Sequence, residues 1–284
     1  MLPTRNLQAA NTLKEPKDLG THHAYALMDA NSGGVLLSDN LNKKIYPAST
    51  VKIMTAIIAL EHMQLNTKIK VKKKVIKNIH GGVAKYGLKT GEKYTLNCLL
   101  HILMLVSGAD AAQVIADAVG GSVEEFVDIM NAKAKALEMA GSHFDNPIGL
   151  DIGDGFKKTY ATAYDYCLLT KYAMQNEQFC NIVGKKHYKV KRVDGTFERK
   201  LTNSNRFYTI TEYDKDLYQV IGTKTGTTNA AGHAFIATAI DKDGHKVICA
   251  YYSKESTTRL FSDIRKLLNK AFHAHQNGKI ILTV

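Results

Sequence analysis

The chain has 284 residues, 45% hydrophobic and 23% charged, with a formal net charge of +12. This composition is typical of a globular protein with enough apolar side chains for a sizeable core. No stretch approaches the ~18 consecutive apolar residues of a membrane-spanning helix, so none is predicted. Residues 1–20 are polar, are expected to form a loose N-terminal arm, and lack the apolar run of about 7–15 residues found in export signals.

The first predicted elements are two strands at 23–30 and 34–40, joined by a hairpin turn at the sequence NSG. A helix is expected over about 49–64. Residues 67–96 contain short strand-like pieces interrupted by glycines.

Helical periodicity dominates residues 96–140, in three segments. In the third segment Ser122 is followed by Glu125, the spacing of a capping box. The same logic predicts another helix at Thr162, with Asp165 three residues on.

From about residue 185 the period returns to two, which predicts strands at 186–193, 218–226 and 233–254, the last a hairpin. An amphipathic helix follows at 257–275. Because strands occur near both ends and helices between them, we expect an α+β fold with an antiparallel sheet assembled from both chain ends, flanked by helices. A single domain over 21–275 is predicted, with an all-helical lobe inserted at roughly 67–165, a tail at 276–284 and no second β-rich domain.

The positive charge favours anionic partners through long-range attraction. Lysines cluster in KIKVKKKVIK (68–77) and GKKHYKVKRV (184–193), where they alternate with Val, Ile or Tyr. This pattern predicts half-exposed strands with a solvated face, and a surface for an anionic polymer is the second interpretation. No nucleic-acid-binding signature occurs, so nucleic acid is not an expected partner.

Cysteine and histidine usage gives no metal motif, and no catalytic metal or cofactor is expected. No C-x-x-C pair or H-E-x-x-H sequence is present. The cysteines lie in apolar or helical contexts and are predicted to be buried free thiols. They are Cys98, Cys167, Cys180 and Cys249.

One candidate for chemistry is Ser49-Thr50-Val51-Lys52, an S-x-x-K sequence at a predicted helix start. Residues three apart share a helix face, so the Ser49 hydroxyl and the Lys52 amine can meet. Desolvation near a helix N-terminus lowers the pKa of a lysine, and a neutral Lys52 could activate Ser49 as a nucleophile. The simpler interpretation is a helix cap beside a lysine that reaches solvent.

Two further short motifs follow in the chain. Ser107-Gly108-Ala109-Asp110 lies between an apolar helix and the next helix, where Ser107 either faces a cleft or caps a helix. Lys224-Thr225-Gly226 lies on a strand predicted at the edge of a sheet, where the glycine lets a ligand approach the backbone. In the order S-x-x-K, S-G-x, K-T-G, the three form a known set in serine enzymes that interact with penicillin.

The chain closely resembles the low-molecular-mass penicillin-binding proteins, which are serine D-alanyl-D-alanine carboxypeptidases. The resemblance covers roughly residues 22–270 and includes YPASTVKIMTAIIALE, SGADAAQVIAD, GSVEEFVDIMN, SHFDNPIGLD and GTKTGTTNAAGHAFIATA. It implies a β-lactamase/transpeptidase-like fold, peptidoglycan stem peptides as substrates, acylation by β-lactams, and an extracytoplasmic location. It gives no oligomeric state, and neither the extra β-rich domain nor the membrane anchor of many relatives is recognisable.

The resemblance also assigns roles to individual residues. Ser49 is the nucleophile, Lys52 the general base and Ser107 a proton relay. Lys224, Thr225, Gly226 and Thr227 bind the substrate, and the backbone N–H groups of Ser49 and Thr227 form the oxyanion hole.

One residue departs from the family pattern. The third position of the second motif is usually Asn, whose amide binds the substrate backbone, and here it is Ala109. The loss of one such hydrogen bond is worth about 1–3 kcal/mol, which affects efficiency and peptide specificity more than the type of reaction.

Three other functions remain open. A D,D-endopeptidase would cut cross-links with the same residues. A serine β-lactamase needs a deacylating glutamate, for which Glu177 in the sequence EQFCN is the nearest match. A non-catalytic β-lactam sensor is the third alternative.

Overall fold

The computed structural model describes residues 13, 22–77, 79, 82–150, 159–210 and 213–278. Most of the expected N-terminal arm and the last six residues of the expected tail lie outside the described residues. The proposed domain boundaries therefore stay predictions.

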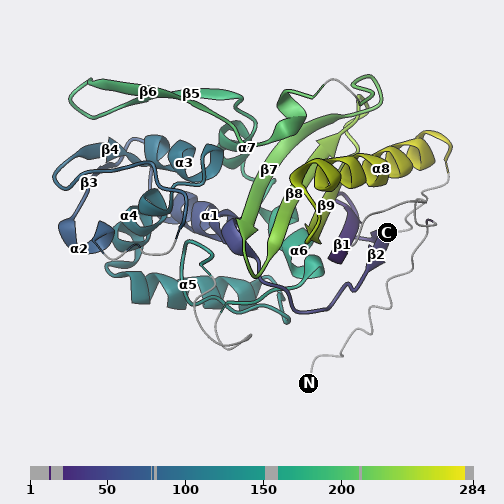
Figure 1. Ribbon diagram of the computed structural model, residues 1–284, viewed down its shortest axis with the longest axis horizontal. Coiled ribbons are helices and arrows are strands. Elements are labelled where there is room, and N and C mark those ends of the chain that lie inside the picture. The colour runs from purple at the N-terminus through teal and green to yellow at the C-terminus, as the bar shows by residue number, and fades with distance from the viewer. Residues whose placement is uncertain are drawn as a thin grey trace.

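The main sheet has five antiparallel strands in the order β2-β1-β9-β8-β7. Strands β1 and β2 come from the start of the chain, and β7, β8 and β9 come from its last third (Figure 1). Their bounds are His22–Asp29, Val35–Asp39, Gln219–Thr228, Gly232–Ile240 and Lys246–Ser253. The prediction of an antiparallel sheet assembled from both chain ends is confirmed.

The sheet is buried on both faces. Because alternate residues of a strand point to opposite sides, each strand contributes side chains to two cores. Helix α8 (Thr257–Gln276) packs on one face, and helices α1 (Lys52–His62) and α6 (Ala163–Ala173) pack on the other. Strand β1 shows the division clearly. Tyr25 and Leu27 belong to the core under α8, whereas Ala24, Ala26 and Met28 belong to the core under α1 and α6.

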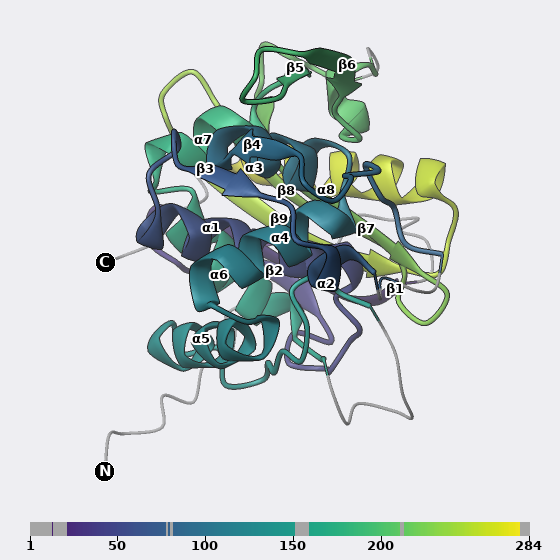
Figure 2. The ribbon, with the colours of Figure 1, turned by 90° about the vertical axis from the view of Figure 1, so that its left-hand side faces the viewer.

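The expected helices of the middle region are present as α3 (Leu96–Leu105), α4 (Ala109–Gly120) and α5 (Val123–Ala136). They lie together with α1 beside the β7 edge of the sheet (Figure 2). Both predicted caps are confirmed: the Ser122 hydroxyl accepts from the Glu125 N–H, and the Thr162 hydroxyl accepts from the Asp165 N–H.

The structure also describes two separate pairs of antiparallel strands, β3–β4 and β5–β6, and several short helical segments. They are β3 (Lys68–Lys70), α2 (Lys73–Ile76), β4 (Lys93–Thr95), α7 (Glu177–Val183), β5 (His187–Lys191), β6 (Phe197–Thr202) and the 3₁₀ segment Arg206–Tyr208. The inserted block is thus mainly helical but also contains the β3–β4 pair.

The prediction of one lysine-rich strand over 68–77 is wrong beyond residue 70. Burial then recurs every four residues, at Val71, Val75 and Ile79, which is the spacing of a helix. In addition, Lys72 and Lys74 pair with the carboxylate of Asp117 on α4, at 2.6 and 3.1 Å. Part of this positive charge is therefore neutralised within the protein. The expected strand at 186–193 is confirmed as β5.

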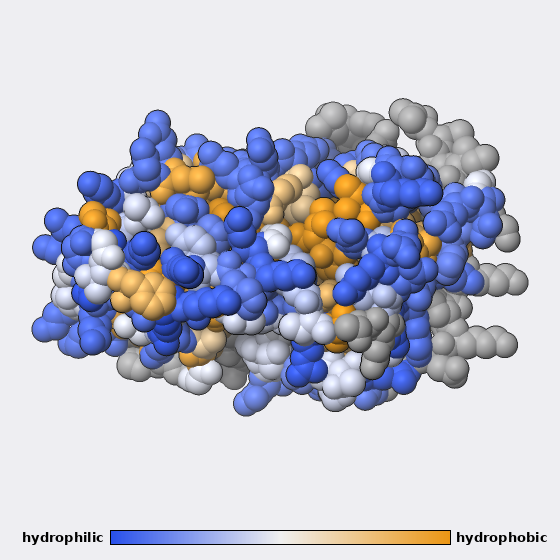
Figure 3. All heavy atoms as spheres, turned by 90° about the horizontal axis from the view of Figure 1, so that it is seen from above, coloured by the Kyte–Doolittle hydropathy of each residue, from blue (hydrophilic) through white to orange (hydrophobic). Residues whose placement is uncertain are grey.

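All four cysteines are free thiols; three are buried and Cys180 is half-buried. Hydrophilic side chains predominate on the face drawn in Figure 3, where apolar side chains form small separate patches. Among the described helices, none has the length and apolar character needed to cross a membrane.

Candidate active site

The nucleophile candidate and the base candidate lie together at the start of α1. Ser49 belongs to a single 3₁₀ turn, Ala48–Val51, which leads directly into the helix that begins at Lys52. The Nζ atom of Lys52 is 2.8 Å from Oγ of Ser49 and donates to the carbonyl oxygen of Ile148 at 2.7 Å. The expectation that the two side chains meet is confirmed by this distance.

Burial favours the neutral form of the Lys52 amine. Its side chain is only 1% exposed, so desolvation disfavours the ammonium form and holds the pKa well below the usual value for lysine. The positive charge of Lys224 lowers this pKa further, and the carboxylate of Asp110 opposes the effect. A neutral amine at hydrogen-bond distance from a serine hydroxyl can accept its proton.

A loop after α5 supplies the second partner of Lys52. Asn146 organises this loop, because its Oδ1 accepts hydrogen bonds from the N–H groups of Ile148, Gly149 and Leu150. Gly149 has φ +78°, and a Cβ there would lie 1.8 Å from the carbonyl oxygen of Ala48. Only glycine therefore allows the loop to lie against the Ser49 turn and aim the Ile148 carbonyl at Lys52.

Strand β7 forms the opposite wall. A Cβ on Gly226 would lie 3.2 Å from the backbone nitrogen of Ser49, so the strand backbone runs directly beside the Ser49 turn. The expected edge position is confirmed, since β7 ends the strand order of the sheet. Thr225 is half-buried with its hydroxyl 2.8 Å from that of Ser204, and the exposed Thr227 has its hydroxyl 3.1 Å from Nδ1 of His233.

Lys224 is the second buried amine of the site. It is 1% exposed, and its Nζ donates to the carbonyl oxygen of Thr225 at 2.8 Å. Desolvation lowers its pKa to about 7. Because Lys52 and Lys224 repel each other, a positive charge on Lys224 favours the neutral form of Lys52.

The second motif lies where α3 gives way to α4. Ser107 has φ +60°, a left-handed conformation that is unusual for a residue other than glycine. Its Oγ is buried and has no hydrogen-bond partner among the described residues. Ala48, directly before Ser49, has φ +50°. Left-handed non-glycine residues are frequent at active sites, where the surrounding structure holds them.

Asp110 is a residue whose importance the sequence did not reveal. Its buried carboxylate accepts hydrogen bonds from the N–H groups of Tyr86, Gly87 and Leu88 at 2.9, 2.6 and 2.9 Å. It therefore ties the 86–88 segment to the start of α4. The only hint was its position directly after Ser107-Gly108-Ala109. Ala109 is the first residue of α4 and fully buried, so its methyl group offers no hydrogen bond to a peptide.

We predict that Asp110→Asn destabilises the fold and shifts the pH dependence of acylation. The amide replaces one acceptor oxygen by an NH₂ donor that faces backbone N–H groups. This mismatch lowers the free energy of unfolding by about 1–3 kcal/mol. Removing the negative charge also lowers the pKa of Lys52 further, so the rise in rate that follows loss of the Lys52 proton, the acidic limb of the pH profile, moves to lower pH. Thermal unfolding and the pH profile of penicillin acylation measure the two effects. An acidic limb at unchanged pH would contradict the assigned coupling.

Comparison with known proteins places the chain in a family. A family model described as D-alanyl-D-alanine carboxypeptidase, peptidase family S11, matches residues 10–253. DacF of Bacillus subtilis is 31% identical over 254 residues, which are 88% of this chain and 62% of DacF. DacB2 of Mycobacterium tuberculosis is 31% identical over 245 residues, 86% of this chain and 78% of DacB2. Both carry the name D-alanyl-D-alanine carboxypeptidase.

Solved structures show the same fold. The Streptomyces K15 DD-transpeptidase matches with a TM-score of 0.80 at 28% identity, over 92% of this chain and 100% of the other. A D-alanyl-D-alanine carboxypeptidase from Mycobacterium tuberculosis matches with a TM-score of 0.80 at 28% identity, over 94% and 96%.

The fold is thus that of the penicillin-binding class of serine peptidases. Within this class, the chain belongs to the D-alanyl-D-alanine carboxypeptidase family. It spans 62% of the length of DacF.

Proposed function

We propose that the protein is a serine D-alanyl-D-alanine carboxypeptidase that removes the terminal D-alanine from peptidoglycan stem peptides. The observation that carries the proposal is the 2.8 Å separation between Ser49 Oγ and the buried amine of Lys52, beside the K-T-G strand. Family membership supports the same reaction. Because peptidoglycan lies outside the cytoplasm, the proposed substrate implies an extracytoplasmic location. The positive net charge is compatible with an anionic wall polymer.

In the proposed reaction, Lys52 takes the proton of Ser49 as Oγ attacks the carbonyl carbon of the D-Ala-D-Ala bond. The backbone N–H groups of Ser49 and Thr227 stabilise the oxyanion, a contribution of about 3 kcal/mol for each such donor. The C–N bond then breaks, and the amine of the leaving D-alanine takes up the proton from Lys52 through Ser107. Water hydrolyses the ester on Ser49 and regenerates the hydroxyl.

The K-T-G strand would bind the free carboxylate of the substrate. The hydroxyls of Thr225 and Thr227 are suited to donate hydrogen bonds to it, and a protonated Lys224 supplies the opposite charge. A β-lactam presents a carboxylate and a strained amide in a similar arrangement and is expected to acylate Ser49.

Three incubations test the proposal: one with a diacetyl-Lys-D-Ala-D-Ala peptide, one with a penicillin and one with cross-linked peptide dimers. We expect release of D-alanine from the peptide and a long-lived covalent penicillin adduct, read by the mass of the protein. Rapid penicillin turnover without an adduct would indicate a β-lactamase instead, although Glu177 is exposed on the first turn of α7. Cleavage of cross-linked dimers without D-alanine release would indicate an endopeptidase, and neither signal would leave a non-catalytic protein.

The two buried amines predict a bell-shaped pH profile for acylation. Activity rises with pH as Lys52 loses its proton, at a pH well below the usual pKa of lysine. It falls again as Lys224 loses its charge, since the pKa of Lys224 is lowered to about 7. In Lys224→Arg the charge persists at all accessible pH values, so the basic limb should move upward. The second-order rate constant of penicillin acylation between pH 5 and 10 measures this, and an unmoved basic limb would contradict the assignment.

A further inference from the structure

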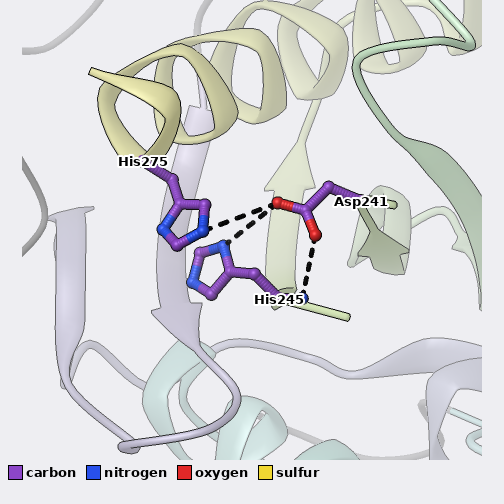
Figure 4. Close-up of side chains that lie close together, drawn as sticks. All are labelled: Asp241, His245 and His275. Atoms are coloured by element: carbon purple, nitrogen blue, oxygen red, sulfur yellow. Dashed lines mark hydrogen bonds and ion pairs between the residues drawn. The ribbon is translucent and has the colours of Figure 1, made fainter. Parts of the chain in front are cut away.

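Three potential metal ligands converge between the β8–β9 turn and the end of α8, away from Ser49. Asp241 follows β8, His245 precedes β9 in the same hairpin, and His275 lies on the last turn of α8 (Figure 4). Oδ2 of Asp241 is 4.0 Å from Nδ1 of His245 and 3.7 Å from Nε2 of His275. One ligand atom from each residue lies within 4.8 Å of the other two.

The three atoms face one another without being hydrogen-bonded. Separations of 3.7 and 4.0 Å exceed hydrogen-bond distance. His245 is only 9% exposed, and its Nδ1 is buried without a hydrogen-bond partner among the described residues. A buried nitrogen without a hydrogen-bond partner is unfavourable, and the lone pair of Nδ1 is available for another ligand.

The groups around His245 favour the imidazole form whose Nδ1 has a free lone pair. Nε2 of His245 contacts the carboxylate of Asp29, and the other oxygen of that carboxylate accepts from the N–H and the hydroxyl of Ser32 at 2.7 and 2.9 Å. A hydrogen on Nε2 leaves Nδ1 with its lone pair free, and such a carboxylate–histidine pair is the usual support of a metal-binding histidine.

Asp241 is prepared in a similar way. Its Oδ1 accepts from the backbone N–H groups of Asp243 and His245 at 3.0 and 2.9 Å. These bonds fix the carboxylate in the hairpin turn and direct the second oxygen, Oδ2, toward the two imidazoles (Figure 4).

We propose that Asp241, His245 and His275 form a structural site for a divalent transition metal, with Zn²⁺ as the best match. Two imidazole nitrogens and one carboxylate oxygen are borderline ligands of the kind Zn²⁺ takes, with water in the fourth position. Zn²⁺ bonds of about 2.0–2.1 Å at tetrahedral angles place ligand atoms about 3.3 Å apart. The separations of 3.7 and 4.0 Å from Asp241 to the two imidazole nitrogens therefore need to contract by about 0.4 and 0.7 Å.

His275 makes the largest adjustment. Its ring stacks on that of His245, with centroids 3.8 Å apart and planes 18° from parallel, so its Nε2 must turn toward the shared point. The side chain is 33% exposed at the end of α8, which leaves room for this rotation. The bound metal then joins α8 to the β8–β9 turn and, through Asp29, to β1, and it stabilises the face of the sheet opposite α1 without entering the reaction.

The test is Zn²⁺ binding to the untagged full chain after treatment with a chelator. We expect one Zn²⁺ per chain by elemental analysis after dialysis, and a higher melting temperature with Zn²⁺. His275→Ala should weaken binding by at least 100-fold. Asp29→Asn should weaken it by about 10–100-fold, because it loosens the orientation of His245. Co²⁺ in place of Zn²⁺ should give visible absorption of tetrahedral intensity in the wild type, and His275→Ala should lose it.

The matched control is His273→Ala, which removes an exposed histidine from the same last turn of α8. It should bind Zn²⁺ like the wild type. Equal binding by His275→Ala and the wild type would overturn the proposal. The absence of stoichiometric Zn²⁺ on the wild type would also overturn it. This includes the result that the melting temperature changes with pH but not with Zn²⁺.

Discussion

Ser49→Ala is expected to abolish both release of D-alanine and formation of the penicillin adduct, with a loss of about 10⁴-fold or more, as is typical for removal of a serine nucleophile. The methyl group has no electron pair to attack a carbonyl, and no other described hydroxyl lies at hydrogen-bond distance from Nζ of Lys52. Intact-protein mass spectrometry after incubation with penicillin measures the adduct.

The variant should remain folded, because the 3₁₀ turn of Ser49 has no side-chain cap to lose. Ser122→Ala is the matched control. It removes the N-cap hydroxyl of α5, so it should lower stability by about 1 kcal/mol and leave acylation unchanged. An adduct that persists in Ser49→Ala would identify a different nucleophile.

Lys52→Met is expected to slow acylation by about 10³–10⁵-fold while the protein stays folded. Methionine fills a similar buried volume but cannot take the proton from Ser49, and general-base catalysis of this kind contributes about 10²–10⁴-fold before the disturbed position of Ser49 is included. Stopped-flow acylation by a chromogenic cephalosporin measures the rate.

The control for this variant is Lys133→Met, which removes a surface amine that pairs with Glu61 at 2.7 Å. A surface ion pair of this type is worth about 1 kcal/mol or less, and acylation should not change. If Lys52→Met acylated at the wild-type rate, Lys52 would not be the base. Lys52→Arg should be as slow as Lys52→Met, because a guanidinium keeps its proton.

Local sequence was sufficient for most of the regular structure. The strands of the two long hairpins, the helices of the middle region and the caps at Ser122 and Thr162 follow from periodicity and from side chains that bond within three residues. The exception is the segment after residue 70, where the alternation of lysines with apolar residues resembles the pattern of a strand. There, packing of Val71 and Val75 against neighbouring helices favours a helix instead.

The meeting of Ser49 and Lys52 was also predictable, since three residues on a helical turn set the distance between their side chains. The expectation that desolvation lowers the pKa of Lys52 also agrees with its burial. The sequence did not reveal the distant groups around this amine: the Ile148 carbonyl, held by Asn146 in a loop almost 100 residues away, accepts its hydrogen bond, and the Asp110 carboxylate opposes the lowering of its pKa. Nothing in the local pattern around Lys52 encodes these contacts.

The sequence by itself thus determined the fold class, the order of its elements and the candidate residues for chemistry, because these depend on patterns within a few residues. The tertiary structure alone decided which distant groups surround them. It brought β7 against the Ser49 turn, buried the amines of Lys52 and Lys224 so that desolvation lowers the pKa of each, and placed His275 beside Asp241 and His245. The physical reason is that desolvation, charge coupling and ligand geometry depend on distance in space, which packing of the whole chain sets.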